Sequence, residues 1–145
     1  MIKLYLITTL FILGYSCLKL YMGKLDDKKT ETLDKDCKEL LRKTGSKNFI
    51  RLVFAFSSIQ LIFATINYTL FSFVVEYIYA LVLFVVSFSM RLYVIKRSTN
   101  ILRICLAKHD KPISVWVRYG FLKRTLASNV LYLDTFVVFY TLLHI

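Results

Sequence analysis

The sequence predicts an all-α integral membrane protein: a bundle of four transmembrane helices, both termini outside, with helical basic extensions in the cytoplasm. Three observations support this fold class. Of the 145 residues, 57% are hydrophobic, whereas a soluble domain usually has about 45–50%. The apolar residues form four long runs. Most of the 20 lysines and arginines lie in the two segments that separate alternate runs.

Each apolar run is long enough to cross a membrane as a helix. About 20 residues at a rise of about 1.5 Å span the hydrocarbon layer, which is about 30 Å thick. The expected spans are residues 2–22, 49–71, 74–95 and 126–145. The runs are continuous, which favours helices over the alternating strands of a barrel. One domain, residues 1–145, is expected for a chain of this length.

Charge predicts the orientation of the spans. Residues 24–51 carry nine basic and six acidic side chains, and residues 91–124 carry nine basic side chains and one acid. Cytoplasmic segments are enriched in lysine and arginine, so loops 24–48 and 96–125 should face the cytoplasm. A tight outer hairpin is then expected at residues 72–76. The expected location is a bacterial inner membrane or an organellar inner membrane.

A second interpretation of the first span was considered. Lys3, the apolar run and Gly14-Tyr15-Ser16-Cys17 also resemble a bacterial lipoprotein signal. Cleavage there would place the basic segment 24–51 outside, against the charge rule. An uncleaved helix is therefore favoured.

Both cytoplasmic loops carry helical patterns. Leu33, Cys37, Leu40 and Leu41 share one helix face, which predicts a surface helix against the membrane or a partner. Gly45 should end this helix, and Ser46 should cap the next one. No glycine or proline lies between residues 74 and 111, so the third helix should run past the membrane and end before Pro112.

Asp134 is the most unusual residue of the spans, because a carboxylate at the bilayer centre costs about 3 kcal/mol or more. It is expected to face the bundle interior, either as a proton or cation site or as a hydrogen-bonding contact between helices. Polar or small residues at helical spacing are its candidate neighbours: Ser57, Gln60, Ala64, Asn67, Ala80, Ser87, Ala127, Asn129 and Thr141. Arg91 is expected to reach lipid phosphate rather than Asp134, which should lie one to two turns deeper.

The second candidate surface is basic and cytoplasmic. It comprises Arg91, Lys96, Arg97, Arg103, Lys108, Lys111, Arg118, Lys123 and Arg124. An anionic lipid leaflet is the first expected partner, because each cation near it contributes about 1 kcal/mol. An acidic cytoplasmic protein is the second. Nucleic acid is not expected, because no binding motif accompanies the charge.

The sequence contains no signature of catalysis. The three cysteines, Cys17, Cys37 and Cys105, form no metal-binding or redox spacing, and no hydrolase, kinase or metalloprotease motif occurs. No catalytic residue, metal or cofactor is expected. The predicted function is a non-enzymatic membrane subunit that oligomerises or anchors a cytoplasmic partner or larger complex. The alternatives are a channel- or holin-like homo-oligomeric pore using Asp134, and a small membrane enzyme or redox-complex subunit.

Overall fold

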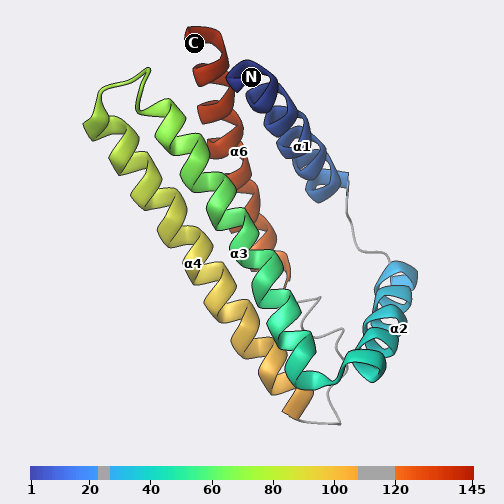
Figure 1. The fold of residues 1–145 in the computed structure, drawn as a ribbon. Helices are drawn as coiled ribbons and strands as arrows, with labels where there is room; N and C mark the ends of the chain where they lie inside the picture. Colours follow the sequence, from blue (N-terminus) through green and yellow to red (C-terminus); the bar gives the residue numbers. More distant parts are fainter. Residues whose placement is uncertain (23–26, 108–119) are drawn as a thin grey trace.

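A computed structural model of the chain describes residues 1–22, 27–107 and 120–145, and these residues form helices and no strands (Figure 1). The helices are α1 (Ile2–Met22), α2 (Asp27–Thr44), α3 (Ser46–Phe71), α4 (Tyr77–Ala107) and α6 (Gly120–His144). The expectation of an all-α protein is therefore confirmed over the described ranges.

Two helices, α3 and α4, are long and apolar enough to cross a membrane. Only 11% of the most apolar window of each is buried within the protein. A core helix of a soluble protein would be mostly buried, so this exposure suits an apolar surrounding. The described side chains of α1 make a shorter apolar stretch, Ile2–Leu18, and those of α6 do not pass the same test. Four spans therefore stay a prediction.

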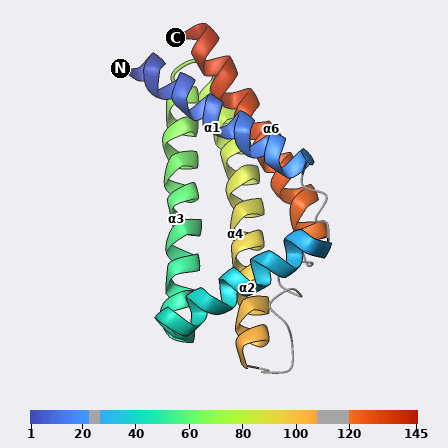
Figure 2. The ribbon, with the colours of Figure 1, turned by 90° about the vertical axis from the view of Figure 1, so that its right-hand side faces the viewer.

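The long helices alternate in direction (Figure 1). α3 and α4 form an antiparallel hairpin whose turn covers residues 72–76, where the sequence predicts it. α6 packs against both, and α1 packs chiefly against α6. In Figure 2, α1 crosses the other helices obliquely instead of running beside them. The two chain termini and the hairpin turn lie at one end of the bundle (Figure 1).

The helices extend beyond the expected spans. α3 begins three residues before the expected span, at Ser46, and α4 continues to Ala107, as the lack of a helix breaker predicts. α6 already begins at Gly120. The predicted helix end before Pro112 lies outside the described residues.

The predicted surface helix is present as α2, and Gly45 ends it. Gly45 has a φ of 79°, a left-handed conformation that glycine adopts without a steric penalty. The predicted role of Ser46 is wrong. Gly45 occupies the cap position without a side-chain cap bond, and Ser46 is already the first residue of α3. One residue is thus enough to turn the chain from α2 into α3.

The apolar core joins α3, α4 and α6 near the hairpin. It contains Tyr68, Phe71, Ala80 and Val137. The rings of Tyr68 and Phe84 meet edge to face with centroids 5.7 Å apart, a favourable geometry for aromatic pairs. Small Ala80 and the β-branched Val137 leave room for these rings. This packing places the adjacent turns of the three helices around one interior position.

Candidate functional site

Asp134 occupies the interior position shared by α3, α4 and α6. It is 3% exposed, and the neighbouring Val130, Val137 and Val138 on the same helix are also buried. The carboxylate therefore lies within an apolar interface, as expected for a charged residue in an apolar helix.

Arg91 of α4 forms an ion pair with Asp134 of α6, through Nη2 and Oδ2. The expectation that Arg91 would reach phosphate instead is wrong. Side chains on a helix lean toward its N-terminus, so Arg91 extends back over the preceding turn of α4 to the depth of Asp134. The two side chains are only 10% and 4% exposed.

Two hydroxyl groups complete the coordination of the carboxylate. Tyr68 Oη of α3 donates to Asp134 Oδ1 at 3.2 Å, and Ser87 Oγ of α4 donates to the same oxygen at 3.3 Å. Arg91 Nε in turn donates to Ser87 Oγ at 3.4 Å. We call these four residues, Tyr68, Ser87, Arg91 and Asp134, the polar cluster. The polar cluster joins three helices. Within it, Ser87, Arg91 and Asp134 each contact the other two, which links α4 to α6.

The polar cluster satisfies its charges within one chain. A buried ion pair of this kind adds little stability over an apolar interface, but removing one partner leaves an uncompensated charge and costs about 3–5 kcal/mol. The cluster therefore specifies which helices pack together and at what depth. The Asp134 carboxylate is engaged by the guanidinium of Arg91 and by two hydroxyl groups.

The other polar candidates of the predicted spans divide into two groups. Asn67 and Thr141 are buried, as the predicted interior faces require, and Ser57 is half-buried. Thr141 and Ser57 donate to backbone carbonyls of their own helices. Gln60 and Asn129 are exposed, so these two do not face the interior of the described bundle. Gln60 shares the helix face of Ala64 and Asn67, so its exposure reflects its position along α3: apart from Phe49, the buried residues of α3 begin at Ala64 and lie toward the hairpin.

Two buried polar atoms have no hydrogen-bond partner among the described residues: Asn67 Oδ1 of α3 and Tyr5 Oη of α1. The Tyr5 ring stacks on Phe63, one turn before Asn67, with centroids 6.4 Å apart. A buried polar atom without a partner costs about 1–3 kcal/mol. These two side chains therefore contrast with the polar cluster, in which the hydroxyls and charges have partners.

The exposed cations of α3 and α4 lie at the end of the bundle opposite the termini. Because α3 and α4 are antiparallel, the start of α3 lies beside the end of α4 (Figure 1). We call the exposed cations of this region the basic end: Arg42, Lys43, Lys47, Arg51, Lys96, Arg97 and Arg103. Of the other predicted basic residues, Lys108, Lys111 and Arg118 lie outside the described residues, as do the side chains of Lys123 and Arg124.

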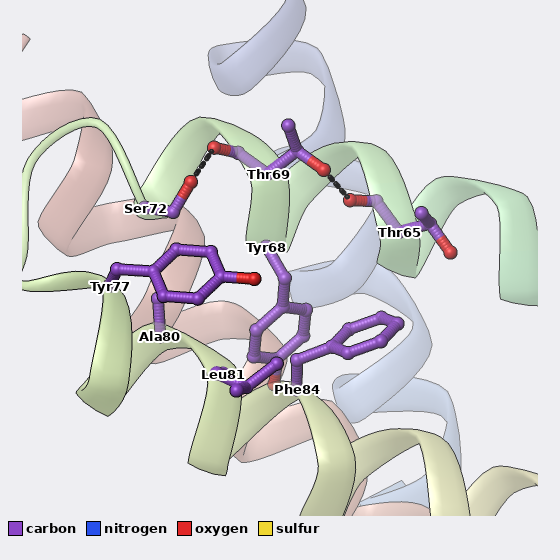
Figure 3. Close-up of a pocket in the computed structure, with 8 residues that line it drawn as sticks. All are labelled: Thr65, Tyr68, Thr69, Ser72, Tyr77, Ala80, Leu81 and Phe84. Carbon is purple, nitrogen blue, oxygen red and sulfur yellow. Dashed lines mark hydrogen bonds between the residues drawn. The ribbon is translucent and has the colours of Figure 1, made fainter.

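A groove of about 240 Å³ lies between α3 and α4 near the hairpin (Figure 3). It is lined by Thr65, Tyr68, Thr69, Ser72, Tyr77, Ala80, Leu81 and Phe84. The hydroxyls of Thr65, Thr69 and Ser72 donate to carbonyls of the preceding turn at 2.7–2.9 Å. Its polar groups are thus largely satisfied by the helix itself, and no charged residue lines it.

Tyr68 is the functional residue that the sequence did not reveal. Its ring lines the groove, while its hydroxyl reaches the buried carboxylate on the other side. A mid-helix tyrosine beside Asn67 carries a usable signal, since a buried tyrosine hydroxyl normally requires a partner. The helical spacing of polar and small residues in α3 indicated Asn67 but not the adjacent Tyr68.

Comparison of the chain with models of protein families, with characterised proteins and with solved structures finds no match. Over the described residues, no group of three or more histidine, cysteine, aspartate or glutamate side chains is arranged to hold a metal ion. The geometry therefore defines a helical protein with two membrane-length helices, an interior polar cluster and a basic end.

Proposed function

We propose that this protein is a non-enzymatic, polytopic membrane subunit that anchors an acidic cytoplasmic protein through its basic end. The observation that carries the proposal is the separation of charge from apolar surface. Exposed cations of α3 and α4 gather at one end, while the hairpin at the other end has one exposed acid, Glu76. A cation-rich end on apolar helices is what a cytoplasmic face requires.

The proposed topology has four spans, with both termini outside. The alternating direction of the long helices and the shared position of the termini and the hairpin support it (Figure 1). An inner membrane of a bacterium or an organelle, with an anionic cytoplasmic or matrix-side leaflet, is the proposed location. The oblique path of α1 in Figure 2 means that its crossing would be strongly tilted.

The length of α4 favours a protein partner over lipid alone. Its 31 residues make a helix of about 46 Å, against a hydrocarbon layer of about 30 Å. The last turns, which carry Arg103, therefore extend past the hydrocarbon layer, where a docked protein can reach them. Cations held on a rigid helix in water are available to carboxylates of a docked protein.

Charge reversal at the basic end tests the proposal. The triple variant Lys96→Glu, Arg97→Glu and Arg103→Glu should lose the proteins that co-purify with the tagged chain from its native membrane. Membrane insertion, measured by protease protection, should be unchanged. The charge-preserving triple Lys96→Arg, Arg97→Lys and Arg103→Lys is the matched control and should retain them. Retention of every co-purifying protein by the reversed variant would contradict the anchoring role.

A homo-oligomeric pore is the alternative, and the polar cluster gives it less support. Asp134 is paired with Arg91 inside one chain, and the second proposed pore residue, Gln60, lies on an exposed face. A conducting role predicts proton- or voltage-dependent conductance in liposomes that Asp134→Asn alters. Equal conductance of the wild type and this variant would remove Asp134 from any pathway.

A further inference from the structure

We propose that α2 is an interfacial helix whose apolar edge rests on the phospholipid surface beside the basic end. This surface is additional to the protein-docking role, and it requires only that α3 crosses the membrane. The proposal rests on three properties of α2: an incompletely covered apolar edge, a polar side that is neutralised internally, and a fixed crosswise connection to α3.

The apolar edge is formed by Cys37, Leu40 and Leu41, which follow each other at helical spacing. Leu40 is 47% exposed, and Cys37 and Leu41 are half-buried. Burial also raises the pKa of the Cys37 thiol, with a smaller effect of the Asp34 and Asp36 carboxylates. The rest of the chain thus covers part of this edge, and Leu40 keeps apolar surface exposed.

The polar side of α2 balances its own charge. Three pairs join residues four apart: Glu31 with Lys35 at 3.7 Å, Asp34 with Lys38 at 3.0 Å and Glu39 with Lys43 at 2.8 Å. The 18 residues carry five acidic and six basic side chains. A helix with so little net charge has weak electrostatic attraction for a charged protein. The apolar edge is then its main means of binding.

The connection to α3 fixes where α2 lies. Gly45, with its φ of 79°, is the single residue between α2 and α3. In Figure 2, α2 lies crosswise to α3 at the end of the bundle that carries the cations. A helix attached crosswise to the cytoplasmic end of a membrane-crossing helix lies along the membrane surface. The short tether also keeps α2 at a high effective concentration there.

Phospholipid is therefore the occupant that fits. Interfacial helices place an apolar face about 5–10 Å into the boundary between headgroups and acyl chains, with their charges in water. Most of them also use a cationic face. For α2 the cations beside it, Lys47 and Arg51 of α3, supply the attraction to anionic headgroups instead.

Cys37 provides a native site for the test. The variant Cys17→Ala, Cys105→Ala leaves it as the single cysteine for a nitroxide label, in nanodiscs of phosphatidylcholine and phosphatidylglycerol. Its matched control carries Lys35→Cys with all three native cysteines replaced by alanine, because Lys35 lies on the opposite, exposed side of α2. Power saturation with oxygen and with a water-soluble nickel chelate then reports the depth of each label.

The label at Cys37 should show high oxygen accessibility and a nickel accessibility several-fold below that of the label at position 35. Adding Leu40→Glu should raise the nickel accessibility at Cys37 toward the control value. Equal nickel accessibility at both positions would show α2 in water and overturn the proposal. Low accessibility of Cys37 to both reagents would show a protein contact instead, and would overturn it too. Neither result bears on the charge-reversal test at the basic end.

Discussion

The polar cluster and the helix α2 contain the same chemistry in opposite surroundings. Asp134 and Arg91 are 4% and 10% exposed, whereas the side chains of Glu31 and Lys35 are 71% and 76% exposed. Exposed pairs contribute about 0–1 kcal/mol, because water and salt replace each partner readily. A buried pair has no such replacement. Burial, not the number of ion pairs, therefore decides which charges determine the architecture of this chain.

The largest expected effect comes from breaking the buried pair. Arg91→Met should destabilise the protein by about 3–5 kcal/mol, because Asp134 then keeps a buried charge without its cation. The melting temperature of the detergent-purified protein measures the loss. Arg103→Met, an exposed arginine on the same helix, should change stability by about 0.5 kcal/mol or less.

A double variant tests whether the charges of Arg91 and Asp134 compensate each other. Arg91→Met combined with Asp134→Leu should recover most of the stability lost in the single variant, because an apolar pair often replaces a buried ion pair at no cost. A double variant as unstable as Arg91→Met would contradict the view that the two charges compensate each other.

Removing one hydroxyl from the polar cluster should have an intermediate effect. Tyr68→Phe deletes the donor to Asp134 Oδ1 and should cost about 1–3 kcal/mol in the same melting experiment. Tyr79→Phe on exposed surface is the matched control and should be neutral. Equal changes in the melting temperature of the two variants would show that the 3.2 Å hydrogen bond does not contribute to stability.

Breaking an exposed pair should have a small effect that salt removes. Lys43→Ala should cost about 0.3–0.5 kcal/mol at low ionic strength, because its exposed pair with Glu39 supports α2 at a spacing of four residues. Near 1 M salt, where the screening length is about 3 Å, the difference should disappear. The loss of stability in Arg91→Met should persist at that salt concentration. If salt also reduced the loss in Arg91→Met, the buried and exposed pairs would not differ as proposed.

The pH dependence of Cys37 reports the partial burial of α2. The thiolate is the form that reacts with alkylating reagents, so a raised pKa shifts the alkylation profile to higher pH. In the variant with Cys17→Ala and Cys105→Ala, folded protein should react more slowly near pH 8 than the same chain in denaturant. Asp34→Asn with Asp36→Asn should move the profile back only in part, because burial is the larger cause. Identical alkylation profiles for folded and denatured protein would contradict the partial burial of Cys37.

Apolar runs and helical periodicity predicted most of the helices. The helix ranges, the hairpin at 72–76 and the extension of α4 follow from apolar runs and from the positions of glycine and proline. The same patterns indicated that Asp134 would be buried. They could not show the reach of a long side chain: Arg91 was assigned by the depth of its backbone, while its guanidinium lies one turn away.

Tyr68 and Gly45 illustrate the two kinds of information that the patterns lacked. The Tyr68 hydroxyl meets a carboxylate 66 residues further along the chain, and only the packing of α3 against α6 brings them together. Gly45 was expected to end a helix, but its left-handed backbone also starts the next one without a capping side chain. Local rules name such residues without giving the three-dimensional contacts that they make.

The division of the polar cluster between α4 and α6 has a consequence for synthesis. A ribosome completes α4 before it makes α6, so Arg91 emerges 43 residues before the aspartate that neutralises it. If both helices enter the bilayer, the guanidinium must wait at the insertion machinery or at the headgroups, with Ser87 as its nearest hydroxyl. A nascent chain stopped before residue 134 therefore carries Arg91 without its counter-ion.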